Sequence, residues 1–197
     1  MPLFWKPMKS VSHEIKYDVS FIGKFHGDRF EFFKKIRKIC EETKLDYFFR
    51  IILTRKITRR DRIYRLFGIS TFGKIDINDP IVSKKYMSEK EVTEIIQSSR
   101  CIIDSGINIQ HGLTNRLIIS LSQNKKLLTT NKYLLQDPLF FDNLNVRIID
   151  REKPILDKKF IESEFEYQEK FEKIFKLLEI DNWLKIILNG ESINDIF

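Results

Sequence analysis

One stretch of the sequence, residues 101–131, constrains the fold more than any other. It begins with a short β-branched run at residues 101–104, passes through a polar loop that contains glycine, and continues into an amphipathic segment at residues 113–122. A second short apolar run follows at residues 126–129. Runs of these lengths and periods predict a strand, a loop, a helix and a strand in that order. In such a unit the loop N–H groups and the helix N-terminus lie where a ligand diphosphate can bind.

The same alternation of strands and helices extends over most of the chain. Further buried strands are predicted at residues 17–23, 47–53 and 145–150, and further helices at 30–43 and 88–98. The second of these helices opens with a capping box formed by Ser88 and Glu91. This alternation predicts an α/β fold, a Rossmann-like doubly wound parallel sheet with helices on both faces. Two helices, at residues 160–178 and 180–188, are expected to finish the sheet, whereas residues 54–87 indicate short mixed elements.

Composition limits the compartment and the class of partner. The chain has 35 Lys and Arg against 28 Asp and Glu, a net charge of +7, which favours anionic partners such as nucleotides, acidic glycans or a membrane surface. The excess is spread along the chain, so a solvated basic surface is the favoured interpretation. For the arginines between residues 55 and 65, attraction of an anionic acceptor is the alternative.

The chain has no apolar run of the roughly 18 to 20 residues that a membrane span needs, and no secretory signal. A cytoplasmic location is therefore expected, with peripheral contact at the inner membrane as an alternative. Cys40 and Cys101 both lie in apolar segments, which predicts buried thiols, and no metal site is expected.

Two predicted strands end in glycine-bearing polar loops, at residues 23–29 and 104–114. Ligands of open α/β sheets bind outside the carboxyl ends of strands, so both loops should face one edge. Gly112 permits close backbone approach, Thr114 offers a hydroxyl near a helix start, and Arg116 can donate a charge-assisted fork to phosphate. In the alternative, Gly-Leu-Thr is an ordinary helix cap and Arg116 pairs with an acidic neighbour such as Asp104.

Other polar residues in these loops have two interpretations. Asp104 is expected to bond loop amides rather than act in catalysis. His111 and His26 either contact a donor or are plain loop residues, and the second interpretation is favoured for both.

Five segments carry a resemblance to a known family. They are residues 18–23 together with Asp28 and Arg29, and residues 101–104, 110–116, 125–131 and 146–150. In this order they resemble the C-terminal half of bacterial GT-B glycosyltransferases. Within this family they resemble the group that includes CgeB-like proteins and many lipopolysaccharide and capsule biosynthesis proteins. The resemblance runs from about residue 17 to the C-terminus.

The resemblance implies a domain that holds a nucleotide-sugar donor, needs no cofactor or metal, and serves transfer of the sugar to a cell-envelope glycan or lipid-linked acceptor. It identifies no catalytic residue. It places Gly23, His26, Asp28 and Arg29 in a loop at the cleft between two domains. The residues that it brings to the donor diphosphate are Gln110, His111, Gly112, Leu113, Thr114 and Arg116.

The sequence departs from this family in two ways. Relatives carry a glutamate that accepts hydrogen bonds from the nucleotide ribose where this chain has Ile119, and isoleucine cannot accept them. Members of this family also have an N-terminal acceptor domain, which is expected to be absent from this chain.

The expected organisation is therefore a linker-like segment at residues 1–16, a nucleotide-sugar-binding domain at 17–156, and packed helices at 157–197, as part of a longer or split enzyme. The alternative is a non-catalytic module that binds nucleoside diphosphates or a separate N-terminal acceptor domain. No nucleic-acid partner is expected, because basic and aromatic residues do not interleave on one face.

Overall fold

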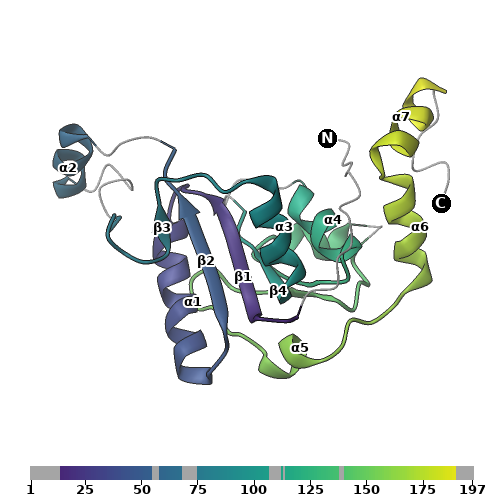
Figure 1. Cartoon of the computed structure of the whole chain (residues 1–197), viewed down its shortest axis with the longest axis horizontal. Coiled ribbons are helices and arrows are strands. Elements are labelled where there is room, and N and C mark those ends of the chain that lie inside the picture. The colour runs from purple at the N-terminus through teal and green to yellow at the C-terminus, as the bar shows by residue number, and fades with distance from the viewer. Residues whose placement is uncertain are drawn as a thin grey trace.

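The centre of the fold is a six-stranded parallel sheet (Figure 1). The computed structural model describes residues 14–54, 58–67, 75–106, 112, 114–137 and 140–189. The strands are β1 (Tyr17–Lys24), β2 (Tyr47–Ile52), β3 (Val82–Ser83), β4 (Ser99–Asp104), β5 (Lys126–Thr129) and β6 (Val146–Ile148). Their order in the sheet is β3-β2-β1-β4-β5-β6, and every adjacent pair is parallel. This confirms the predicted Rossmann-like, doubly wound α/β fold.

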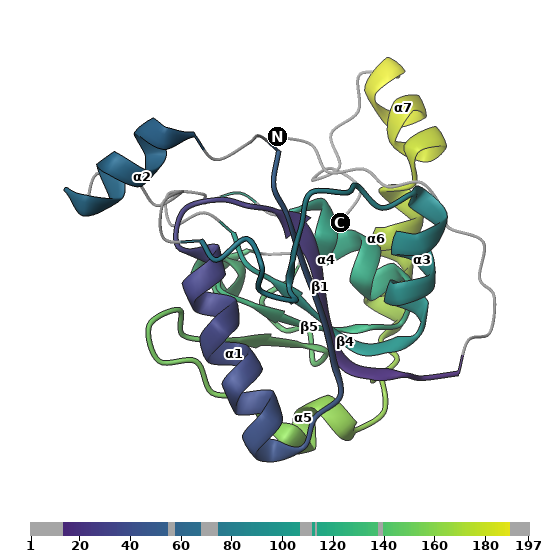
Figure 2. The ribbon, with the colours of Figure 1, turned by 60° about the vertical axis from the view of Figure 1, so that its left-hand side comes forward.

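Helices cover both faces of the sheet (Figure 2). One face carries α1 (Arg29–Thr43) and α5 (Lys158–Glu162), and the other carries α3 (Glu89–Gln97), α4 (Asn115–Ser122) and α6 (Glu169–Leu177). A short 3₁₀ helix, η2 (Lys132–Gln136), follows β5. Two further helices, α2 (Arg59–Leu66) and α7 (Ile180–Leu188), lie farther from the sheet (Figure 1).

Side chains of the central strands alternate between two apolar clusters, one on each face. Cys101 and Ile103 of β4 join the cluster beneath α1 and α5, whereas Ile102 joins the cluster beneath α4 and α6. On β5, Leu127 and Leu128 divide in the same way. Because successive strand residues point to opposite faces, a continuous apolar run marks a strand that is buried on both sides. The short runs in the sequence are therefore the inner strands of the sheet.

The N-termini of two helices are capped by their own residues, the first as predicted and the second as in the alternative interpretation of Gly-Leu-Thr. Ser88 Oγ accepts from the Glu91 N–H at 3.2 Å, while the Glu91 carboxylate accepts from the Ser88 N–H at 2.7 Å, which confirms the capping box of α3. Thr114 caps α4 by accepting from the Leu117 N–H. Helix α4 thus begins at the loop that follows β4.

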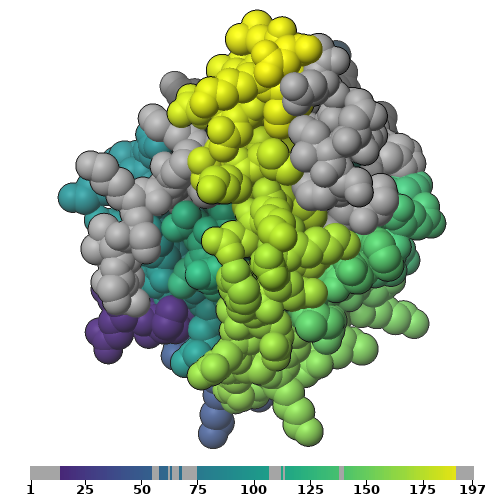
Figure 3. All heavy atoms as spheres, turned by 90° about the vertical axis from the view of Figure 1, so that its right-hand side faces the viewer, coloured from purple at the N-terminus to yellow at the C-terminus, as the bar shows by residue number. Residues whose placement is uncertain are grey.

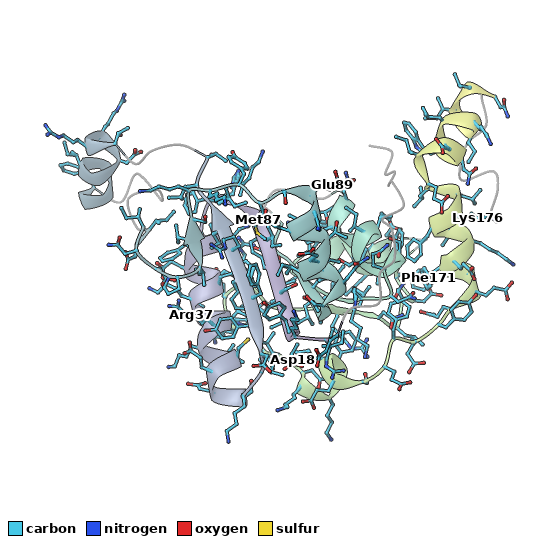
Figure 4. The ribbon with its side chains drawn as sticks, in the orientation of Figure 1. Asp18, Arg37, Met87, Glu89, Phe171 and Lys176 are labelled. Atoms are coloured by element: carbon cyan, nitrogen blue, oxygen red, sulfur yellow. The ribbon has the colours of Figure 1, made fainter. Side chains whose placement is uncertain are left out.

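The prediction of one long helix at residues 160–178 is wrong. The chain forms α5, then an extended segment at residues 163–168, and then α6. The Asn145 side chain donates to the Glu166 carbonyl at 2.7 Å and accepts from the Glu166 N–H at 2.8 Å. The Gln168 side chain also accepts from the Leu144 N–H. These bonds hold residues 163–168 extended along the loop before β6, which places Phe171 of α6 (labelled in Figure 4) in the second apolar cluster.

A buried lysine secures the same break. Lys126 is 3% exposed, and its ammonium donates to the carbonyls of Phe160 and Ser163 at 2.7 and 2.5 Å. These are carbonyls at the end of α5, where no further helical turn satisfies them. The Lys126 ammonium therefore donates the hydrogen bonds that a further helical turn would supply.

We expect Lys126→Met to lower the free energy of unfolding by about 1.5 kcal/mol, because two carbonyls lose a charged donor while the methionine keeps the apolar contacts. Urea denaturation measures this change. Lys132→Met is the matched control, since Lys132 is exposed in a long ion pair with Asp150 and its loss should cost less than about 0.5 kcal/mol. Equal stabilities of the two variants would contradict the role assigned to Lys126.

Candidate anion-binding site

The strand order reverses between β1 and β4, which makes this pair the topological switch point of the sheet. Ligands of open α/β sheets bind in the crevice outside the carboxyl ends of such strands. Both loops singled out in the sequence leave the sheet here, one from the end of β1 and one from the end of β4. Arg29 donates to the Ser105 carbonyl, and Arg151 bonds both Asp28 and Ser105, so the two loops do face the same edge.

Asp104, the last residue of β4, is buried and accepts three hydrogen bonds from described side chains. It accepts from Arg116 Nη1 at 2.7 Å, from Thr114 Oγ1 at 3.0 Å and from Thr129 Oγ1 at 3.3 Å. Among the described residues these partners are side chains, and most of the loop whose amides were expected to bond Asp104 lies outside the described residues, so that expectation stays a prediction. Asp104 anchors the start of α4 to β4 and β5.

Arg116 ties α4 to β1 as well. Its Nη2 donates to the Ile22 carbonyl at 2.9 Å, and its guanidinium lies 4.9 Å from the centroid of the Phe21 ring. Pairing with Asp104 was the alternative to a phosphate contact in the sequence analysis. A direct contact of Arg116 with a ligand stays a prediction.

Gly23 lies inside β1 and not in the loop where the sequence analysis placed it. An added Cβ at this position would come within 2.6 Å of Phe21 Cζ and 3.3 Å of Arg116 Nη2. Glycine is therefore needed here so that the Phe21 ring and the Arg116 guanidinium can pack against the end of β1.

Arg29, the first residue of α1, lies between the end of β1 and the loop that follows β4. It donates to the carbonyls of Lys24 and Ser105, and its guanidinium lies 5.3 Å from the centroid of the Phe21 ring. Its Nε is buried without a hydrogen-bond partner among the described residues. Burial, together with the nearby charges of Arg116 and Arg151, lowers the pKa of Arg29 to about 10. Arg29 is therefore a charged group whose charge the fold itself leaves poorly compensated.

Arg151, which was not predicted from the sequence, completes the site. Its side chain, 12% exposed, donates to the Asp28 carboxylate from Nε at 2.7 Å, and to Ser105 Oγ and the Gly106 carbonyl from Nη1 at 3.0 and 2.9 Å. The hydrogen bond from Arg151 holds the pKa of Asp28 below its ordinary value. A signal was present in the sequence, because Arg151 directly follows the predicted strand at residues 145–150 and thus lies at the carboxyl edge.

These groups leave a net positive charge at the switch point. Arg116 pairs with Asp104, and Arg151 pairs with Asp28. Within the described part of the chain, Arg29 bonds only backbone carbonyls. An anion near these guanidiniums would receive charge-assisted hydrogen bonds in a partly desolvated place, where they are strong.

The structure thus brings Gly23, Asp28, Arg29, Thr114 and Arg116 together around one strand edge. Gly112 is exposed nearby, and its carbonyl accepts from Asn131 Nδ2 at 3.2 Å. His26 is exposed, and its backbone carbonyl accepts from the Arg29 N–H. Gln110, His111 and Leu113 lie outside the described residues, as does most of residues 1–16.

Three further features bear on the possible chemistry. No group of three or more His, Cys, Asp and Glu side chains suited to a metal ion occurs in the described ranges. Among the helices of those ranges, none is long and apolar enough to cross a membrane. Cys40 and Cys101 are buried and unpaired, and burial raises the pKa of Cys40 to about 12, so this thiol is inert at neutral pH.

A cavity of about 490 Å³ lies elsewhere, between the end of α4, the loop before β6 and α6. Helices α6 and α7 form the strip that runs down this side of the molecule (Figure 3). The cavity is lined by Leu121, Asn143, Phe165, Phe171 and Phe175, among others, and by no predicted site residue. The candidate site is therefore defined by the charged residues at the switch point and not by this cavity.

Comparisons with known proteins give one distant likeness. No protein-family model and no curated protein matches the chain. Among solved structures, the chain is similar to the C-terminal domain of a glycosyl transferase group 1 family protein (LpcC) from Francisella tularensis, with 10% sequence identity and a TM-score of 0.42. The match covers 94% of this chain and 95% of that one. A likeness of this degree carries no argument about activity.

Proposed function

We propose that this chain is the donor-binding domain of a GT-B-type glycosyltransferase. It would hold a nucleotide-sugar whose sugar passes to a cell-envelope glycan or lipid-linked acceptor, in the cytoplasm and as part of a longer or split enzyme. Three observations support this: the ordered resemblance of five sequence segments, the switch point between β1 and β4, and the charge of Arg29. The last carries the proposal, because a cation whose hydrogen bonds among the described residues go to backbone carbonyls favours an anionic ligand.

The donor diphosphate would lie against Arg29, with the guanidiniums of Arg116 and Arg151 nearby. When the bond between the anomeric carbon and the diphosphate oxygen breaks, the electron pair and negative charge pass to the leaving nucleoside diphosphate. Fixed cations at that place stabilise the developing charge, and they need no reorganisation to do so.

The acceptor hydroxyl must also lose its proton. Asp104 is the buried carboxylate of this edge, and its bonds to Thr114, Arg116 and Thr129 leave it committed to structure. Asp28 is likewise held by Arg151. Neither of these two carboxylates is therefore free to take this proton, and we propose that the general base lies in an acceptor domain.

A second candidate function is a non-catalytic module that binds nucleoside diphosphates. Ile119 favours it, since this half-buried residue of α4 stands where relatives carry the acceptor for the ribose hydroxyls. Such a module would retain the phosphate site and lose turnover.

Calorimetric titration of the purified chain with UDP, GDP and ADP tests the proposal. We expect weak saturable binding of the diphosphates, with a Kd of about 0.1 to 1 mM, and none of uridine, because the phosphate contacts supply the affinity. The isolated chain should transfer no sugar. Failure of every diphosphate to bind would overturn both candidate functions. Sugar transfer after addition of an acceptor domain would favour the enzyme over the binding module.

A further inference from the structure

Helix α2 stands clear of the sheet in both ribbon views (Figures 1 and 2). It lies between β2 and β3 in the chain, so it follows the carboxyl end of β2, the edge that also carries the candidate anion-binding site. Its first turn is fixed locally: the Asp61 carboxylate accepts from the Thr58 N–H at 2.8 Å and from Thr58 Oγ1 at 2.7 Å. Thr58 and Asp61 therefore cap the N-terminus of α2 with residues of its own segment.

The outer surface of α2 combines apolar and cationic side chains. Ile63 is 53% exposed and Phe67, just past the helix end, is 72% exposed. They are four residues apart, so they lie on one side of the helix. Arg59 and Arg60 are also exposed, and residues 59–66 contain four arginines and one aspartate. That aspartate, Asp61, is buried.

We propose that α2 docks the protein onto an anionic lipid surface. In the docked state Ile63 and Phe67 enter the boundary between headgroups and acyl chains, while Arg59 and Arg60 contact lipid phosphates. Charge complementarity selects this occupant: a short helix with arginines beside exposed apolar side chains matches an interface that is anionic at its surface and apolar beneath it. A nucleic acid would attract the arginines but would offer Ile63 no apolar environment.

This docking does not depend on donor binding, and it therefore goes beyond the proposed function. It turns the carboxyl edge of the sheet toward the membrane. If the proposed function also holds, an acceptor anchored in that membrane would approach the edge where Arg29 lies.

Vesicle co-sedimentation of the whole chain tests the inference. We expect binding to vesicles of phosphatidylcholine mixed with phosphatidylglycerol, little binding to phosphatidylcholine alone, and loss of binding as NaCl is raised. The double variants Ile63→Ser with Phe67→Ser, and Arg59→Glu with Arg60→Glu, should each weaken binding by about tenfold or more.

Matched controls separate α2 from the rest of the surface. Ile187→Ser with Leu188→Ser removes two exposed apolar side chains of α7, and Lys38→Glu with Lys90→Glu reverses two exposed charges on α1 and α3. We expect both control variants to bind mixed vesicles within about twofold of the parent.

Equal losses in the control and α2 variants would overturn the assignment to α2. Binding to a DNA duplex without binding to vesicles would overturn the proposal and show that the partner is a nucleic acid, not a lipid surface. Nucleotide titration of the α2 variants keeps the two proposals apart, because their affinity for UDP should equal that of the parent.

Discussion

Replacing Arg116 by methionine is expected to lower the free energy of unfolding by about 3 kcal/mol, because the buried Asp104 carboxylate would lose its charged partner. The same change removes the hydrogen bond to the Ile22 carbonyl and the contact with the Phe21 ring. Thr114 and Thr129 still donate to Asp104, which keeps the loss near the lower end for a broken buried pair. Urea denaturation followed by circular dichroism measures it.

Arg100→Met is the matched control for this prediction. Arg100 Nε lies 3.3 Å from Asp18 Oδ1 in a pair that is partly exposed, near the start of β1 where Figure 4 labels Asp18. Loss of such a pair should cost less than about 1 kcal/mol. Adding Asp104→Asn to Arg116→Met removes the unpaired charge and should restore part of the loss. Equal costs for Arg116→Met and Arg100→Met would contradict a buried pair at the switch point.

The sheet could be predicted because its signals are local. The apolar runs of β4 and β5 require burial on both faces, and the period of the segment between them fixes α4. The capping box at Ser88 likewise lies within four consecutive residues. Once the strands were known, the rule that parallel strands share a carboxyl edge brought Arg29 and Arg116 to one place.

The features that could not be predicted rest on contacts between residues far apart in the chain. No residue close to Ser163 in the sequence indicates that Lys126 will donate to its carbonyl. The helical pattern of residues 160–178 therefore did not predict the break between α5 and α6. Arg151 meets Asp28 across the carboxyl edge of the sheet, and no local pattern pairs them. The charge balance of the site depends on these pairings, and therefore only the three-dimensional structure shows that Arg29 lacks a carboxylate partner among the described residues.

Arg29→Met tests that charge balance most directly. We expect the affinity for UDP to fall by about 30-fold, equivalent to about 2 kcal/mol, because a charge-assisted contact to the diphosphate is lost. The stability should change by less than about 1 kcal/mol, since the lost bonds to the carbonyls of Lys24 and Ser105 are offset by relief of repulsion from Arg116 and Arg151.

Arg100→Met again serves as the control, because it removes the same group and the same charge from the other edge of the sheet, and it should leave the affinity for UDP unchanged within about twofold. NMR titration of the two folded variants with UDP gives the comparison. A parallel fall in both affinities would mean that the net charge of the chain, and not Arg29, attracts the diphosphate. If Arg29→Met bound UDP as tightly as the parent does, the diphosphate would bind somewhere other than the switch point.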